Sequence, residues 1–210
     1  MEALDFIKES YPGLNYSKKI IDIPDTNRVS MLGLFRLLGY TMGAEIGTLK
    51  GEFAETMFEH IPGLRLFCVD PYESYDGYRE HRVDGELSEY EIEARERLQT
   101  NQAKFIKEYS PEAADQFKKN SLDFVYIDAN HALKNVVDDI CAWYPKVKHG
   151  GIISGHDYIK HKKSRGMHVV QAVNAFCDSY EVYPLFILGR KDKLQGEKRD
   201  RFRSWFFIKP

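Results

Sequence analysis

Short apolar runs of strand length alternate with segments of helical period along most of this chain. In residues 52–61, for example, the apolar side chains fall on one face of a helix. Further helices are predicted at residues 86–102, from Pro111 onward, at 133–144 and at 169–177. The predicted strands are a segment that ends near residue 46 and residues 66–70, 104–110, 122–127, 152–154, 183–188 and 204–208. This alternation is typical of βαβ units in an open, mostly parallel sheet.

The first forty residues show a different pattern. Apolar residues gather at Leu4–Ile7 and again from Val29 to Leu38, and Pro12, Gly13 and Pro24 separate the two groups. We expect residues 1–40 to form a helical N-terminal extension. No repeat, low-complexity tract or second boundary is visible, so residues 1–210 are predicted to be a single domain.

A glycine turn follows the first predicted strand of the sheet. Residues 43–51 read Gly-Ala-Glu-Ile-Gly-Thr-Leu-Lys-Gly, and the next strand ends at Asp70. Ligands of open parallel sheets bind at the strands' carboxyl ends, where glycines allow a close approach and an acid can hold a ribose diol. The turn lacks the middle glycine of the phosphate-binding Gly-x-Gly-x-x-Gly motif, and Glu45 would repel a pyrophosphate. The pattern therefore favours a cationic ligand.

Two later strands also end in polar residues. Residues 122–127 lead into Asp128-Ala-Asn-His131, and residues 152–154 lead into Gly-His156-Asp157. Because parallel strands end at one edge of their sheet, we expect Asp128, His131, His156 and Asp157 to gather near Gly47 and Asp70. This convergence is the strongest functional signal in the sequence.

These motifs resemble those of the class I S-adenosylmethionine-dependent methyltransferases. The order Asp-x-x-His, helix, Gly-Gly, strand, His-Asp is similar to the small-molecule O-methyltransferase branch that includes macrolide-sugar and cephalosporin-pathway enzymes, over most of residues 42–158. The resemblance implies an α/β, Rossmann-like class I methyltransferase fold. Its sheet would be seven-stranded and mostly parallel, with a C-terminal antiparallel pair and helices on both faces.

The resemblance also implies a set of cofactor-binding residues. Gly47 would lie against the cofactor, Glu45 near its amino-acid part, and Asp70 on the ribose hydroxyls, while Tyr109 and Ser110 would lie beside the adenine. The predicted S-adenosylmethionine site comprises Glu45, Gly47, Thr48, Gly51, Asp70, Tyr109, Ser110 and Asp128. The alternatives are an ordinary βαβ unit with a glycine turn, and a plain turn at Tyr109 and Ser110.

In relatives from that branch, an acid and an acidic pair hold a divalent cation and a histidine acts as the base. Asp128 and Asp157 match the ligand positions, and His131 matches the base. His156 stands where an acid is expected, and an imidazole ligand favours manganese, iron, cobalt or zinc over magnesium. Asp128, His156 and Asp157 are thus the predicted metal ligands, and His131 and Asp128 the predicted catalytic residues. The alternatives are a helix-capping role for Asp128 and a polar strand end for the other two.

The expected function is S-adenosylmethionine-dependent O-methylation of a small-molecule hydroxyl, with a sugar as one candidate acceptor and a divalent cation (Mg²⁺, Mn²⁺ or another) as a candidate second cofactor. One alternative is a domain that binds S-adenosylmethionine without turning it over. Another is metal-free methyl transfer to nitrogen or to nucleic acid. A nicotinamide-dependent oxidoreductase is disfavoured by Glu45 and by the missing glycine.

Charge and loop composition add less. Thirty basic and thirty-two acidic side chains give a formal net charge of −2, which argues against a dedicated nucleic-acid binder. An acidic N-terminus and the lack of a long apolar run favour a cytoplasmic protein without a membrane partner. The sequence leaves open whether the protein is a homo-oligomer.

Residues 71–85 are predicted to be a lid or a passive surface loop. Basic residues at 159–166 and 189–203 are either simply solvated or receive an acidic acceptor.

Overall fold

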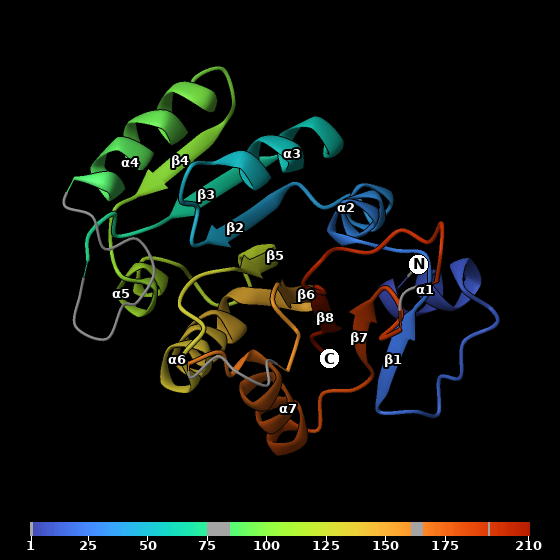
Figure 1. Cartoon of the computed structure of the whole chain (residues 1–210). Coiled ribbons are helices and arrows are strands. Elements are labelled where there is room, and N and C mark those ends of the chain that lie inside the picture. The colour runs from blue at the N-terminus through green and yellow to red at the C-terminus, as the bar shows by residue number, and fades with distance from the viewer. Residues whose placement is uncertain (1, 75–84, 161–165, 193) are drawn as a thin grey trace.

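The computed structural model describes residues 2–74, 85–160, 166–192 and 194–210 (Figure 1). Helices and strands alternate through most of it, as the apolar pattern predicts. In chain order the elements are α1 (Ala3–Ser10), β1 (Ile20–Ile23), α2 (Arg28–Leu37), β2 (Met42–Ile46), α3 (Glu52–His60), β3 (Arg65–Val69), α4 (Glu86–Arg97), β4 (Ala103–Ile106), α5 (Ser110–Asp115), β5 (Leu122–Ile127), α6 (Leu133–Trp143), the 3₁₀ turn η1 (Tyr144–Lys146), β6 (Val147–Gly155), α7 (Val169–Tyr180), β7 (Leu185–Leu188) and β8 (Trp205–Ile208).

The strands form one sheet in the order β1-β7-β8-β6-β5-β2-β3-β4. β8 is antiparallel to both of its neighbours, β6 and β7, and the other pairings between the described strands are parallel. The predicted architecture, a mostly parallel Rossmann-like sheet closed by an antiparallel pair near the C-terminus, is confirmed.

The sheet has eight strands rather than the predicted seven, because the N-terminal extension contributes β1. This strand pairs in parallel with β7, and Ile21 lies opposite Phe186. Ile21 and Ile23 are buried whereas Ile20 is exposed, which is the alternation of a strand with one covered face. A strand of four residues between two helices is too short for a period of two to stand out in the sequence.

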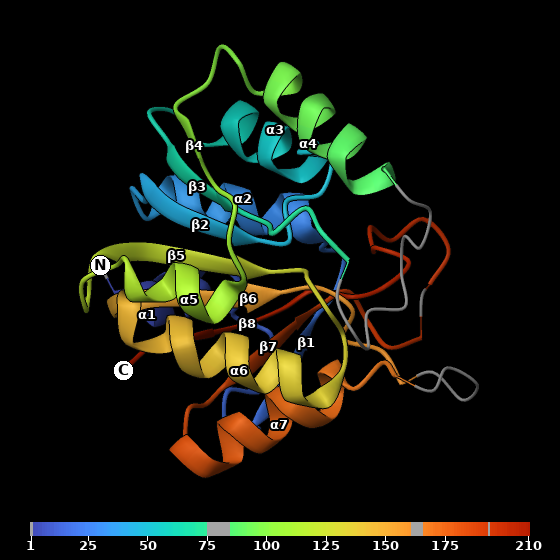
Figure 2. The same ribbon diagram turned by 90° about the vertical axis from the view of Figure 1, so that its left-hand side faces the viewer.

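Helices cover both faces of the sheet, as predicted. Figure 2 shows α5, α6 and α7 on the side opposite α3 and α4. Met31 of α2 and Met57 of α3 pack in one apolar core together with Ile7 of α1. Val136 of α6 and Val173 of α7 belong to the core on the other face. None of the described helices is long and apolar enough to cross a membrane.

The strands at the centre of the sheet end level with one another. Ile46 of β2 pairs with Val69 of β3 on one side and with Ile127 of β5 on the other, and Ile127 pairs with Gly155 of β6. The chain forms β3 and β4 on one side of β2 and then crosses to form β5 on the other side. The strand order therefore reverses between β2 and β5. Open α/β sheets bind their ligands at such a point.

The predicted lid, residues 71–85, lies largely outside the described residues, which omit 75–84. Within its described part, Tyr72 is buried, and its hydroxyl donates a hydrogen bond to the carbonyl oxygen of Leu49 at 2.9 Å. Tyr72 therefore packs against the glycine turn.

Candidate active site

A cavity of about 430 Å³ opens at the carboxyl ends of β2, β3 and β5. Ligand pockets of enzymes fall in this size range. Its walls come from the glycine turn, the end of β3, the start of α5, the end of β5 and the first turns of α6. All of the predicted cofactor residues except Gly51 line it, namely Glu45, Gly47, Thr48, Asp70, Tyr109, Ser110 and Asp128.

Gly47 brings the turn after β2 against the end of β5. Its φ is +87°, and a Cβ on it would lie 2.2 Å from the carbonyl oxygen of Asp128. Backbone hydrogen bonds fix this approach, because Gly47 N–H donates to the Val69 carbonyl oxygen and Asp128 N–H to that of Ile46, each at 2.8 Å. Only glycine satisfies both the conformation and the space.

Gly51 has a structural role. It precedes α3 as its N-cap with φ +74°, and a Cβ there would lie 3.2 Å from Cδ1 of Leu98, at the C-terminal end of α4. The glycine thus lets α3 and α4 pack closely. The predicted contact of Gly51 with a cofactor has no counterpart in the cavity, because the residue faces a helix.

Asp70 is held firmly at the end of β3. Its carboxylate accepts hydrogen bonds from the backbone N–H of Leu49 at 2.9 Å and of Tyr72 at 2.8 Å. The side chain is buried, yet it belongs to the cavity wall. Each carboxylate oxygen can accept further hydrogen bonds, so this arrangement presents fixed acceptors to a ligand such as a ribose diol.

Glu45 lies deeper in the same wall. It is only 2% exposed, and Oε2 has no hydrogen-bond partner among the described residues. Burial raises the pKa of this carboxyl well above its usual value, and the negative charges of Asp128 and Asp70 add to the effect. A buried acid of this kind is stabilised by a cationic or hydrogen-donating ligand.

The opposite end of the cavity is formed by α5 and α6. Tyr109 and Ser110 border it, and Ser110 Oγ accepts a hydrogen bond from Nε1 of Trp143 at 2.9 Å. Asp139 of α6 also lines it, and burial raises the pKa of Asp139 to about 7 although Ser110 hydrogen-bonds to it. Sequence reasoning missed Asp139, although its position three residues after Val136 and four before Trp143 places it on the buried face of α6.

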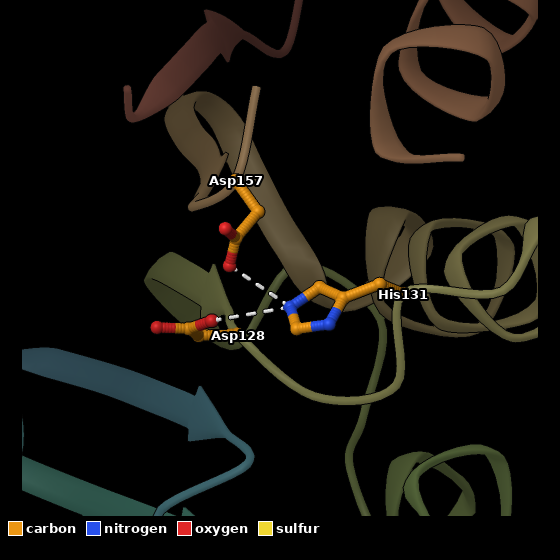
Figure 3. Close-up of side chains that lie close together, drawn as sticks. All are labelled: Asp128, His131 and Asp157. Atoms are coloured by element: carbon orange, nitrogen blue, oxygen red, sulfur yellow. Dashed lines mark ion pairs between the residues drawn. The ribbon is translucent and has the colours of Figure 1, made fainter. Parts of the chain in front are cut away.

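The polar residues after β5 and β6 meet beside this cavity (Figure 3). Nε2 of His131 lies 2.9 Å from Oδ2 of Asp157 and 3.7 Å from Oδ1 of Asp128. One ligand atom from each of these three residues lies within 4.8 Å of the others, as expected of a metal-binding group. Asp128 also lines the cavity, so it joins the two parts of the site.

His156 borders the same two acids. Its Nδ1 lies 3.3 Å from Oδ2 of Asp157 and 3.6 Å from Oδ2 of Asp128. The predicted ligands Asp128, His156 and Asp157 are therefore neighbours, but His131, the predicted base, completes the tightest group. The predicted convergence of these four side chains is therefore observed, with both imidazoles close to the same two carboxylates.

The charges within this cluster are strongly coupled. Burial raises the pKa of Asp157, but hydrogen bonds and positive charge from His131 and His156 outweigh it and hold that pKa well below the usual range. Burial lowers the pKa of His156, whereas Asp157 and Asp128 raise it to a net value above the ordinary one. Asp157 thus stays ionised and can orient an imidazole or bind a cation.

The basic segments predicted to receive an acidic acceptor are partly neutralised. Residues 161–165 lie outside the described part of the chain. In the second segment, Nε of Arg190 pairs with Glu197 at 2.9 Å, and Arg203 pairs with Asp22 at 2.8 Å. An acidic acceptor stays a prediction for the remaining basic side chains.

Comparisons with known proteins agree with this arrangement. Residues 44–158, more than half of the chain, match the model of a family described as a methyltransferase domain. None of the curated proteins compared with the sequence matches it.

Solved structures share the fold. An O-methyltransferase from Bacillus cereus in complex with S-adenosylhomocysteine has a TM-score of 0.58 and 16% identity, covering 99% of this chain and 89% of that one. A Staphylococcus aureus protein assigned as a caffeoyl-CoA O-methyltransferase has a TM-score of 0.59 and 16% identity, covering 98% and 90%. A Clostridium thermocellum protein assigned as an rRNA methylase has a TM-score of 0.59 and 10% identity, covering 89% and 97%. At these sequence identities the similarity supports only a shared fold. The methyl acceptors named for these proteins differ from one another.

Proposed function

This chain belongs to the methyltransferase domain family, and from that premise we propose that it transfers the methyl group of S-adenosylmethionine to a hydroxyl of a small molecule, a sugar being one candidate. One observation carries the proposal. The acids and histidines that can activate a hydroxyl, Asp128, His131 and Asp157, gather at the border of the cavity that Glu45 and Asp70 line.

The cavity residues fit S-adenosylmethionine. Gly47 keeps the backbone of the turn free of a side chain, and the fixed carboxylate of Asp70 suits the two ribose hydroxyls. Glu45 has an oxygen without a partner among the described residues and suits a positive group. When bound, S-adenosylmethionine supplies a methyl group that its sulfonium makes electrophilic. The excess of buried acid around the cavity favours this cationic donor over a pyrophosphate.

The side chains of the cluster also fit a divalent cation. Asp128 and Asp157 offer carboxylate oxygens and His131 an imidazole nitrogen, and these ligand atoms lie within 4.8 Å of one another. His156 lies outside this mutually close group but borders both acids, with Nδ1 at 3.6 Å from Asp128 and 3.3 Å from Asp157. Two imidazoles favour manganese, cobalt, iron or zinc over magnesium. A cation bound there would lower the pKa of an acceptor hydroxyl and fix its oxygen.

His131 also fits the role of general base. Asp157 can accept the Nε2 proton of the ring and hold its orientation, which leaves Nδ1 as the basic nitrogen. A neutral hydroxyl attacks poorly until its proton is removed, and a positioned base typically contributes about 10²–10⁴-fold to such a step. Asp128 stabilises the positive charge that His131 gains. His131 could act as a metal ligand or as the general base. Whether the reaction requires a metal ion distinguishes these two roles.

The test is turnover of S-adenosylmethionine with a panel of hydroxyl, amine and RNA acceptors, with and without chelator. The proposal expects methylation of a hydroxyl. Methylation of amines or RNA alone would contradict it, and binding of S-adenosylmethionine without turnover of any acceptor would favour a non-catalytic binding domain.

A further inference from the structure

Arg28 reaches the active-site cavity from the N-terminal extension. It is the first residue of α2, and Asn27 and Ser30 form a capping box that fixes the start of this helix. The backbone N–H of Arg28 donates a hydrogen bond to Oδ2 of Asp200 at 2.8 Å. The side chain then lies over the ring of Phe53, with the guanidinium carbon 4.6 Å from the ring centroid. Two separate segments and one aromatic ring thus hold this cation at the cavity wall.

Among the described residues, the guanidinium of Arg28 has no carboxylate partner of the kind that the other long cations of the cavity have. Lys50 pairs with Glu93, and Lys134 pairs with Asp138. Arg28 hydrogen-bonds to Tyr126 but forms no ion pair with a carboxylate of the described residues, although it is half-buried. A half-buried guanidinium with a planar set of donors suits a carboxylate ligand, which it can bind through two parallel hydrogen bonds.

Glu45 offers a buried carboxyl group in the same wall. Its Oε2 is buried and has no hydrogen-bond partner among the described residues. Arg28 lies close enough for its positive charge to lower the pKa of Glu45, although burial and the neighbouring acids keep that pKa raised. Within the described residues, the cavity therefore presents an acceptor without a hydrogen-bond partner close to a cation without a carboxylate ion-pair partner, which is the pattern that an α-amino acid group, an ammonium beside a carboxylate, would complete.

We propose that Arg28 binds the carboxylate of the amino-acid end of S-adenosylmethionine while Glu45 binds its ammonium. The inference rests on the proposed function and goes further, because it assigns part of the cofactor site to the N-terminal extension. The helix α2 then acts as one wall of the cofactor site, and Asp200 positions it from the loop before β8. The 44–158 segment alone lacks this carboxylate receptor.

The experiment measures binding by calorimetry with three ligands. S-adenosylhomocysteine carries both charged groups, its decarboxylated form keeps only the ammonium, and 5′-methylthioadenosine has neither. The variants are Arg28→Met, which keeps an apolar stem over Phe53, and Glu45→Gln. Arg36→Met, at an exposed position of the same helix, is the control.

Arg28→Met should weaken the binding of S-adenosylhomocysteine by about tenfold or more, as expected for the loss of a hydrogen bond between charged groups. The same variant should bind the decarboxylated form and 5′-methylthioadenosine within about twofold of the wild type. Glu45→Gln should weaken the binding of both ammonium-bearing ligands and leave the binding of 5′-methylthioadenosine unchanged. Arg28→Lys keeps the charge but loses the planar fork, so it should fall between wild type and Arg28→Met.

Two results would overturn the assignment. Unchanged affinity of Arg28→Met for S-adenosylhomocysteine would place Arg28 elsewhere, for instance on an acidic acceptor. An equal loss for all three ligands would mean that the substitution disturbs the whole cavity. Failure of the wild type to bind any of the three would instead refute the proposed function, which keeps the two claims separate.

Discussion

Nε2 of His131 lies 2.9 Å from Oδ2 of Asp157, although the two residues follow different strands of the sheet. The level ends of β5 and β6 produce this contact, because Ile127 and Gly155 are paired in register. The pair is the chemical centre of the account, since it can either orient a base or hold a cation.

His131→Ala should lower turnover by about 10²-fold or more, whether the ring is a base or a ligand. Binding of S-adenosylhomocysteine should stay within about threefold of wild type, because the ring contacts the acids of the cluster rather than Glu45 or Asp70. His149→Ala, at an exposed position at the other end of β6, is the control. Wild-type turnover in His131→Ala would remove His131 from the mechanism.

Metal preference provides a second test. After treatment with a chelator, activity should return better with Mn²⁺ or Co²⁺ than with Mg²⁺, because two imidazoles border the two carboxylates. His156→Asp replaces one imidazole by a harder ligand and should move the preference toward Mg²⁺ by about tenfold. Metal titrations of activity and of Mn²⁺ binding measure both effects. Full activity of the metal-free protein would leave His131 as a base without a cation.

Gly47→Ala should damage both fold and site. The new Cβ would overlap the Asp128 carbonyl oxygen, and the residue would keep a φ of +87°. We expect a loss of about 2 kcal/mol or more in the free energy of unfolding, together with weaker S-adenosylhomocysteine binding. Gly33→Ala is the matched control, since a Cβ there meets no atom within 4 Å. Gly33→Ala should stabilise α2 by about 0.5–1 kcal/mol. Denaturant melts measure the stability of both variants. A melt of Gly47→Ala that matches wild type would contradict the packing at Gly47.

Asp139 should make stability depend on pH. Its native pKa of about 7 lies above the ~3.9 of an unfolded aspartate. The folded state therefore keeps a proton that the unfolded state loses, and stability should fall as pH rises from about 4 to 7 and then level off. Asp139→Asn removes this loss, so its stability relative to wild type should rise by about 2–4 kcal/mol from pH 4.5 to 8.

Thermal or urea unfolding across that range measures the Asp139 effect. Asp138→Asn, at the adjacent position where the carboxylate pairs with Lys134, is the control and should not reproduce the slope. Parallel curves for wild type and Asp139→Asn would show that Asp139 is ionised in the folded state.

The sequence predicted most of what positions the site. Strand ends at Asp70, Asp128 and Asp157 follow from short apolar runs, because parallel strands in register bring their carboxyl ends to one edge. The strand β1 was not predicted, because four residues are too few to show the alternation of a strand. Gly51, a predicted cofactor residue by resemblance, packs against α4 and does not line the cavity, so its contact with a cofactor stays a prediction.

The place of Arg28 in the cavity wall could not be predicted, because it depends on how a helix outside the central motifs packs against Phe53. The gathering of His131 and His156 around Asp128 and Asp157 was predicted, because neighbouring parallel strands end at one edge. The tertiary structure adds that His131, and not His156, forms the mutually close group with the two acids.

The central claim is that the cavity edged by Gly47 and Asp70 binds a sulfonium nucleoside. Calorimetric titration of the full chain with S-adenosylhomocysteine, S-adenosylmethionine and NAD tests it most directly. The account predicts one S-adenosylhomocysteine per chain, displaced by S-adenosylmethionine, and no binding of NAD. Binding of NAD without binding of S-adenosylhomocysteine would contradict it.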